Sequence, residues 1–281
     1  MGTVLDGKAI AERIKRQLKE KLREIGGTPN LAILSFNTPA SQFYLKAQRE
    51  QAVSLGIHID EKPLDFDASQ LDVEEKIQHW NNDSAIHGIF VHQPLPHGVD
   101  AQRVSASIDP RKDIEGIHPQ NSARRFFAKA RIGSCTALAV MELIESTGVD
   151  LAGKEAVVVG HSEIVGRPVS MLLLDKLATT TVCHVATKPL EHHVNRADVL
   201  VVAAGQPHLI KGAWIKPGAI VIDVGINVVA GRVVGDVEFE PAKQRAAYIS
   251  PVPGGVGPVT VMMVMKNTVE AFKLQQRGGN G

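Results

Sequence analysis

Four nearly unbroken apolar runs in the second half of the chain constrain the fold most strongly. They are rich in β-branched residues and span residues 156–159, 181–185, 199–203 and 219–222. A strand with one solvated face alternates apolar and polar residues, whereas a strand covered on both faces reads as a continuous apolar run. The runs therefore predict a parallel sheet with crossover helices on both faces, which is an α/β fold.

The first half of the chain also alternates strand and helix patterns. Thr38-Pro39 is typical of a helix N-cap followed by a first-turn proline. Residues 109–121 are expected to form a loop with side chains capable of chemistry. Strands are predicted at residues 31–35, 57–64 and 87–91, and helices at residues 69–82, 136–147 and 259–273.

These patterns predict two α/β domains with a cleft between them. The first comprises residues 1–133 together with a C-terminal segment, residues 262–281, that packs back on the first half of the chain. The second comprises residues 134–261 and contains the four apolar runs.

A glycine turn follows the first apolar run. Gly160-His161-Ser162 leads from the predicted strand into a helix that starts near Gly166. This arrangement resembles the dinucleotide fingerprint, with Ser162 at the middle glycine position. The N-terminus of the following helix offers N–H donors and a partial positive charge to a phosphate. The turn predicts a Rossmann-like NAD(P)-binding domain, with an ordinary tight turn as the alternative.

The end of the next apolar run bears on the choice between NAD and NADP. NAD enzymes usually place an acidic residue there, whereas NADP enzymes offer a basic group. No acid occurs between Cys183 and Lys188, and Val185 cannot bind a phosphate. His161, His184 or Lys188 can serve a 2′-phosphate, so the sequence leaves the preference open.

A stretch rich in Pro and Gly, residues 249–262, precedes the last predicted helix. It contains three prolines and three glycines within fourteen residues. Glycine permits close approach of the backbone to a ligand, and proline fixes φ. We expect this loop to present backbone to a flat ligand, with a tight strand-to-helix connection as the alternative. Two further turns of small residues, 203–205 and 223–227, end later strands of the sheet, where ligands of such folds bind. Taken singly, each of these two turns is more typical of a plain turn.

Composition excludes several other classes of protein. The net charge of the 281 residues is +1, and charges are spread evenly, which argues against a nucleic-acid surface. No apolar run approaches a membrane span, and the amphipathic start does not read as a signal peptide. Cys135 and Cys183 lie outside disulfide or zinc spacing, and the histidines show no metal-binding spacing. We expect a cytoplasmic protein without a metal.

In combination, motifs along the whole chain closely resemble those of the methylenetetrahydrofolate dehydrogenase/cyclohydrolase family. The glycine turn and the Pro/Gly stretch are the most specific of them. The segments that carry the resemblance are residues 39–44, 94–96, 112–113, 116–119, 159–168, 218–227, 234–237 and 251–260.

The resemblance implies a reaction and an assembly. Family members oxidise 5,10-methylene-tetrahydrofolate to the methenyl form with NAD or NADP, and most then hydrolyse the product to 10-formyl-tetrahydrofolate. Tetrahydrofolate would lie across the cleft, the cofactor would lie on the second domain, and a homodimer would form through that domain.

The resemblance also implies site residues by position. The catalytic cluster falls on Tyr44, Gln48, His92 and Glu115. Substrate contacts fall on Tyr44, Gln48, Val91, His92, Gln93, Pro253, Gly254, Gly255, Val256, Gly257 and Pro258. Cofactor contacts fall on Gly160, His161, Ser162, Val185, Ile226, Gly257 and Thr260.

Three positions of this cluster depart from the family pattern. Gln48 stands where the family has its catalytic lysine, His92 where it has glutamine, and Glu115 where it has aspartate. Tyr44 and Gln48 are four residues apart and share one helix face, whereas Lys46 projects elsewhere and cannot replace the lysine. The entry to the second domain, residues 135–139, also lacks the proline and glycine of the family pattern.

These departures affect proton transfer more than hydride transfer. A glutamine amide does not titrate, so the hydrolytic step loses a general acid/base group, and we expect cyclohydrolase activity to be weak or absent. Hydride transfer from the methylene carbon to nicotinamide needs no enzyme base, and positioning carries much of its barrier.

Other hypotheses remain open at this stage. His92 oriented by Glu115 would form a replacement acid/base pair and restore the full bifunctional activity. Alternatively, His92 only hydrogen-bonds Gln48 or the substrate. The chain would otherwise be a catalytically silent folate- or nucleotide-binding paralogue, or an enzyme for a different one-carbon carrier.

Overall fold

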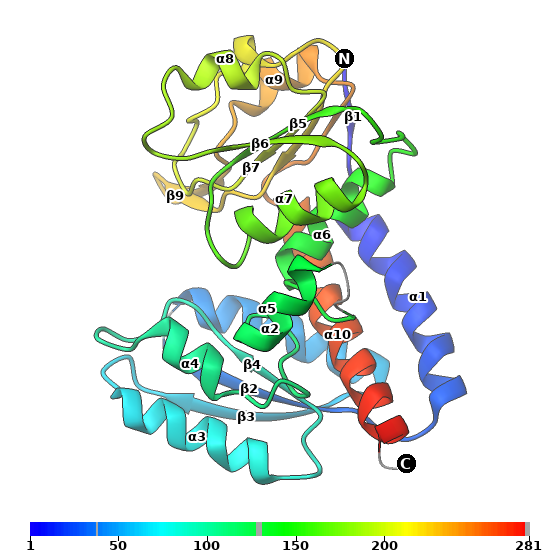
Figure 1. Cartoon of the computed structure of the whole chain (residues 1–281), viewed down its shortest axis with the longest axis vertical. Helices are drawn as coiled ribbons and strands as arrows, with labels where there is room; N and C mark the ends of the chain where they lie inside the picture. Colours follow the sequence, from blue (N-terminus) through cyan, green and yellow to red (C-terminus); the bar gives the residue numbers. More distant parts are fainter. Residues whose placement is uncertain (38, 128–130, 279–281) are drawn as a thin grey trace. The chain divides into compact units, whose positions relative to one another are not determined.

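A computed structural model describes residues 1–37, 39–127 and 131–278 of the chain (Figure 1). The chain divides into two compact units. Unit 1 comprises Met1–Arg13 and Thr136–Thr260, and unit 2 comprises Ile14–Cys135 and Val261–Gly281. Two long helices, α1 (Gly7–Ile25) and α10 (Val256–Gly278), contribute residues to both units.

Unit 1 contains a six-stranded parallel sheet in the order β1-β11-β8-β7-β5-β6. This confirms the predicted Rossmann-like α/β fold. The strands are β1 (Thr3–Val4), β5 (Glu155–Val159), β6 (Thr179–Cys183), β7 (Val199–Val202), β8 (Ile220–Asp223) and β11 (Tyr248–Ile249). The other elements are α6 (Cys135–Glu145), α7 (Gly166–Asp175), α8 (Leu190–Val194), the 3-10 helix η1 (Gly212–Trp214), α9 (Phe239–Arg245) and a hairpin of β9 (Asn227–Val229) and β10 (Arg232–Val234).

The central strands of this sheet are buried on both faces. Every residue of β7 and β8 is buried, so neighbouring side chains that point to opposite faces are both covered. This is the arrangement that continuous apolar runs predict. Two of the predicted runs extend past the carboxyl ends of their strands. β7 ends at Val202, one residue early, and β6 spans Thr179–Cys183, so His184 and Val185 lie beyond it in an exposed turn. Only Cys183 of β6 is fully buried.

The N-terminal residues join the sheet of unit 1. The backbone N–H groups of Gly2, Thr3 and Leu5 donate to carbonyls of Lys243, Ala247 and Ile249. These bonds make β1 an edge strand beside β11, which explains why Met1–Arg13 groups with unit 1 although the sequence assigned it to the first domain.

Unit 2 contains a three-stranded parallel sheet in the order β3-β2-β4. Its centre is filled by Leu34, Phe36, Ile77, Trp80 and Ile89, all buried. Thr38 of the predicted N-cap lies outside the described residues. The elements are β2 (Asn30–Phe36), α2 (Pro39–Leu55), β3 (His58–Leu64), α3 (Gln70–Asn82), β4 (Gly88–Val91), α4 (Ala101–Ser107) and α5 (Pro119–Phe126).

The last helix packs on unit 2 over its second half, as the sequence predicted. The buried Asn267 donates to the carbonyls of Ile114 and Gly133, and Gln275 donates to the carbonyls of His87 and Arg111. Helix α10 begins at Val256, three residues before the predicted start, so part of the expected loop is already helical.

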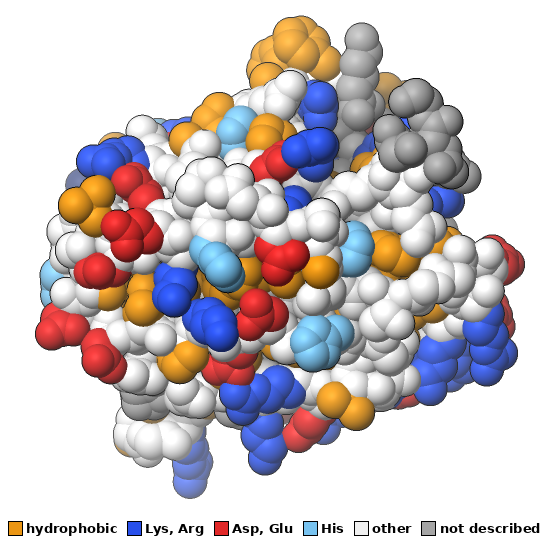
Figure 2. All heavy atoms as spheres, turned by 90° about the horizontal axis from the view of Figure 1, so that it is seen from below, with side chains coloured by type: hydrophobic (Ala, Val, Ile, Leu, Met, Phe, Trp, Pro, Cys, Tyr) orange, Lys and Arg blue, Asp and Glu red, His pale blue; other side chains and the backbone are white. Residues whose placement is uncertain are grey.

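The distribution of charged side chains on the surface follows the even charge pattern of the sequence. Acidic and basic side chains are interspersed on the face of the described residues that Figure 2 shows. No helix among the described residues has the length and apolar character needed to cross a lipid bilayer.

Candidate active site

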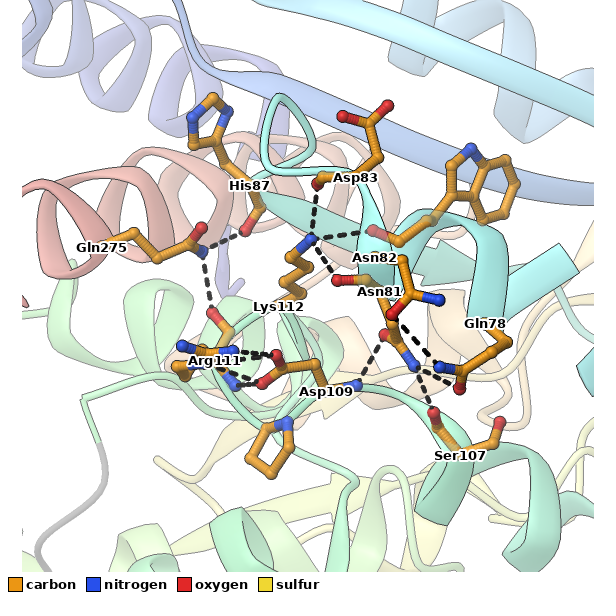
Figure 3. A network of polar contacts seen from close by, with 12 residues as sticks. Gln78, Asn81, Asn82, Asp83, His87, Ser107, Asp109, Arg111, Lys112 and Gln275 are labelled. Carbon is orange, nitrogen blue, oxygen red and sulfur yellow. Dashed lines mark hydrogen bonds and ion pairs between the residues drawn. The ribbon is translucent and has the colours of Figure 1, made fainter. Parts of the chain in front are cut away.

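Lys112 anchors the loop that carries Glu115 to the end of helix α3 (Figure 3). Its buried Nζ donates to the carbonyls of Trp80 at 2.8 Å, Asn81 at 2.9 Å and Asp83 at 2.7 Å. The last carbonyls of a helix have no partner inside the helix and carry partial negative charge. The ammonium therefore satisfies the end of α3 and fixes where the loop starts.

Replacing this lysine by an apolar residue of similar length should destabilise unit 2. In Lys112→Met, three carbonyls lose a charged donor, and we expect the free energy of unfolding to fall by about 2–4 kcal/mol. Urea denaturation measures the change. In the control Lys176→Met, an exposed pair with Glu145 is lost, and the cost should stay below about 1 kcal/mol. Equal losses of unfolding free energy in the two variants would show that the buried Lys112 contacts stabilise the fold no more than an exposed ion pair does.

Asp113 organises the rest of this loop. Its buried carboxylate accepts backbone N–H groups of Glu115, Ile117 and His118 and the side-chain amide of Asn121. The sequence interpretation as a loop was wrong for its last residues, because α5 begins at Pro119. The signal was available, since His118 is the N-cap and proline is favoured at the first helical position.

Glu115 is held in a setting that favours its neutral form. The residue as a whole is half-buried, whereas its carboxyl group is buried. This burial, and next the charge of Asp113, raise the pKa of Glu115 to about 8. The pKa of the buried Cys135 thiol is raised by burial and then by the charge of Glu115, which indicates that the two groups are neighbours. At neutral pH, Glu115 is therefore mainly a protonated hydrogen-bond donor.

Gln48 and His92 form a buried pair. The Gln48 side chain on α2 meets His92 just beyond β4, with 2.9 Å between Oε1 and Nε2. Both residues are almost fully buried, at 2% and 3% exposure. Burial lowers the pKa of His92 to about 4, so the ring is neutral at physiological pH and donates from Nε2 to the amide oxygen. This is the contact that the simpler of the two His92 hypotheses predicted.

The other predicted residues of this region lie close by in the fold. Tyr44 is one turn before Gln48 on α2, and burial raises the pKa of its phenol. Val91 is the buried last residue of β4, and Gln93 is exposed beyond His92. Among the hydrogen bonds of the described residues, none joins His92 to Glu115. The replacement acid/base pair stays a hypothesis without a contact to support it.

The glycine turn of unit 1 has the shape that close packing requires. Gly160 has φ +117°, and a Cβ on it would overlap the carbonyl oxygen of Ala203. A Cβ on Gly166 would overlap the carbonyl oxygen of Gly160. Ser162 Oγ accepts from the N–H groups of Val165 and Gly166 at the start of α7. The Ser162 hydroxyl thus keeps its hydrogen for a ligand, in a turn with the form of a dinucleotide site.

Three of the other predicted cofactor residues, His161, Val185 and Ile226, are exposed in turns that follow strands of the sheet. The rings of His161 and His184 meet edge to face, with centroids 5.4 Å apart. Val185 is almost fully exposed, and Ile226 is more than half exposed. These residues present surface rather than core.

The Pro/Gly segment passes directly into α10. Gly254 has φ +102°, and its carbonyl accepts from the N–H of Gly7. Pro253, Gly254 and Gly255 precede the helix, whereas Val256, Gly257, Pro258 and Thr260 lie in its first turns. Thr260 Oγ1 donates back to the carbonyl of Val256 at 3.1 Å.

Sequence reasoning assigned no supporting role to two buried polar residues. Asn267 on α10 and Asp236 after β10 are buried and donate or accept several hydrogen bonds. A polar residue inside an apolar helix and an aspartate beside Gly235 were the available signals. Within the described residues, no group of three or more His, Cys, Asp or Glu is placed to hold a metal ion.

The parallel sheet and its glycine turn define an NAD(P)-binding α/β protein. Comparison with known domain families then identifies the family to which the chain belongs. The NAD(P)-binding domain of tetrahydrofolate dehydrogenase/cyclohydrolase matches residues 134–276, and the catalytic domain of the same family matches residues 5–115. The chain belongs to the tetrahydrofolate dehydrogenase/cyclohydrolase family, as the sequence motifs indicated.

Individual relatives match over nearly the full length. Bifunctional protein FolD 2 from Geobacter sulfurreducens is 46% identical over 283 residues, which cover 99% of each chain. The bifunctional FolD enzyme from Campylobacter jejuni has a TM-score of 0.94 and 40% identity, covering 98% of this chain and 100% of its own. The Trypanosoma brucei enzyme, solved with NADP and an inhibitor, has a TM-score of 0.94 and 40% identity, covering 98% and 99%.

Proposed function

We propose that this protein reversibly oxidises 5,10-methylene-tetrahydrofolate to 5,10-methenyl-tetrahydrofolate with NAD or NADP. The observation that carries the proposal is the glycine turn at Gly160, packed against Ala203, in a chain whose residues 5–115 match the folate catalytic domain. The cofactor supplies the hydride acceptor. The chain supplies binding and orientation, which carry much of the barrier for hydride transfer.

Each predicted residue has a role in this proposal. Tyr44 and residues 91–93 bind the folate, and the neutral Gln48–His92 pair offers it amide and imidazole hydrogen-bonding groups. The protonated Glu115 donates a hydrogen bond to an acceptor on the ring system. Residues 253–258 contribute further folate contacts. The cofactor contacts Gly160, His161, Ser162, Val185, Ile226, Gly257 and Thr260.

Two predictions for the hydrolytic step compete. The relatives are named bifunctional, and at 46% identity this favours the alternative in which the present chain also hydrolyses the methenyl product. The comparisons support that alternative better than they support a dehydrogenase alone. Weak hydrolysis is favoured by one local observation: Gln48 does not titrate, and its partner His92 is neutral across the physiological range.

A paired assay on one preparation separates these functions. Folate-dependent reduction of NAD and of NADP is followed in one arm, and the decay of methenyl-tetrahydrofolate in the other. Reduction without enzymatic decay supports the dehydrogenase with a weak hydrolytic step, whereas accelerated decay supports the bifunctional enzyme. Absence of both contradicts the proposal and favours a binding paralogue or a different one-carbon carrier.

The family resemblance extends the proposal to assembly and location. We expect a cytoplasmic homodimer that associates through the NAD(P)-binding domain. Sedimentation velocity at several protein concentrations measures the mass, and a monomer at all concentrations would contradict the dimer.

A further inference from the structure

Two aspartates are buried together beneath the carboxyl ends of β7 and β8. Asp223 is the last residue of β8 and Asp236 follows β10, with exposures of 4% and 0%. Carboxylates are costly to bury unless they are paired or hydrogen-bonded. The ion pairs of the described residues give neither of them a Lys or Arg partner, so N–H groups must compensate the charge.

Asp236 holds two exposed turns at once. Its Oδ2 accepts from the backbone N–H groups of Ala204 at 2.7 Å and Gly205 at 2.9 Å, and its Oδ1 accepts from Asn227 Nδ2 at 2.8 Å. Ala204 and Gly205 form the turn after β7, and Asn227 follows the exposed Ile226. The carboxylate lies in the core, while the backbone that it orients faces solvent.

Asp223 holds Asp236 in place. Its Oδ1 accepts from the backbone N–H groups of Gly225 and Asp236, both at 3.0 Å, and its Oδ2 accepts from Val237 at 2.9 Å. Its own backbone N–H donates to the Oγ of Ser250, the second residue of the Pro/Gly segment. One connected network therefore reaches the turn after β7, the turn after β8 and the start of the Pro/Gly segment.

The packing around the two aspartates leaves no room for a side chain at positions 225 and 235. A Cβ on Gly225 would overlap the carboxylate of Asp236, and a Cβ on Gly235 would overlap that of Asp223. The turn after β7, which Asp236 binds, begins at Ala203. The carbonyl oxygen of Ala203 lies against Gly160 of the dinucleotide turn. The network thus sets the position of a turn that touches the cofactor turn directly.

We propose that Asp236, held by Asp223, is a positioning residue for the cofactor: it orients the backbone of residues 204–205 and 226–227 as the surface on which the nicotinamide half of NAD(P) rests. Ligands of parallel sheets bind beyond the carboxyl ends of the strands. The two turns end β7, which pairs with β5, and β8, which pairs with β7 on its other side. The inference rests on NAD(P) use in the proposed function and adds the residues that shape the cofactor surface.

The test is a reversal of hydrogen-bond polarity between Asp236 and Asn227. Asp236→Asn removes the negative charge that three N–H donors share and leaves one acceptor oxygen where the carboxylate has two. The dissociation constant of NAD(P), measured by calorimetry, should rise ~10-fold or more, the effect of losing one charge-assisted hydrogen bond. KM for the cofactor should rise, whereas KM for the folate should change little.

The double variant Asp236→Asn/Asn227→Asp restores the pattern with donor and acceptor exchanged. Its cofactor affinity should return to within ~3-fold of the wild type, since the exchange gives the contact one carboxylate and one amide again. The control is Asp198→Asn, in the same unit at the other end of the strands, where the carboxylate accepts from the backbone of Glu155 and from Lys216. It should lower stability to urea without changing cofactor affinity.

The outcomes separate the inference from the function on which it rests. A wild type that binds neither NAD nor NADP overturns the proposed function and this inference with it. A folded Asp236→Asn variant with wild-type cofactor affinity overturns the inference alone. If that variant does not fold, Asn227→Ala decides: it removes only the bond to the half-buried Asn227, and unchanged cofactor affinity would overturn the inference.

Discussion

Replacing Gln48 by lysine is expected to accelerate the hydrolysis of methenyl-tetrahydrofolate by ~10²- to 10⁴-fold, the usual contribution of general acid/base catalysis. The position is buried and lies beside His92, whose neutral ring offers a nitrogen that can accept from an ammonium group. Burial lowers the pKa of a lysine toward neutrality, which is what a proton-transfer group at this site needs. Gln48→Lys therefore places a titratable group at this position of α2.

The tautomer of His92 changes in this variant. In the wild type, Nε2 donates to the amide oxygen of Gln48, whereas beside a lysine the same nitrogen must accept. Because the pKa of His92 is lowered to about 4, the ring stays neutral and the exchange moves a proton between its two nitrogens without adding a charge. The dehydrogenase rate should change less than the hydrolytic rate, since hydride transfer needs no titrating group here.

The control for this experiment is the same substitution at an exposed helical position. Gln17→Lys on α1 adds the same charge to solvent and should leave both rates at the wild-type level. Methenyl-tetrahydrofolate decay is compared for the three proteins at matched concentration. If the wild type already hydrolyses as fast as Gln48→Lys, then Gln48 does not limit the reaction, and His92→Ala and Glu115→Gln become the variants to examine.

The sheet of unit 1 could be predicted because its signal is local. A strand covered on both faces must be apolar at consecutive positions, and residues 156–159 and 199–203 show this directly. The end of β6 was placed two residues late because Val185, a residue typical of strands, stands fully exposed in the following turn. Burial decides whether an apolar residue belongs to a strand, and a single sequence does not contain burial.

The candidate site was predictable only where its contacts follow from spacing. Tyr44 and Gln48 share a helix face by geometry, and the contact between Gln48 and His92 was one of two hypotheses. The setting of Glu115 was not predictable, because it depends first on burial of the carboxyl group, and Asn267 reaches the same loop from 153 residues beyond Ile114. Such contacts arise from tertiary packing, which sequence spacing does not encode.

The neutral state of Glu115 predicts a particular dependence of stability on pH. Its pKa rises from an ordinary 4.5 to about 8 in the folded chain, so between these values the folded state binds more protons than the unfolded state. Stability from this group is fully present below pH 4.5 and is lost as the pH rises through 8. Glu115→Gln removes the ionisation and should therefore be more stable than the wild type at alkaline pH.

The difference in the free energy of unfolding between Glu115→Gln and the wild type should grow from pH 5 to pH 8 and then level off at roughly 2–5 kcal/mol. Urea denaturation at pH 5, 7 and 9 without ligand measures it, and Glu20→Gln at an exposed position of α1 serves as the control. Parallel pH profiles for Glu115→Gln and the wild type would mean that Glu115 is ionised at neutral pH. It would then accept hydrogen bonds rather than donate them, and its proposed role toward the folate ring would be reversed.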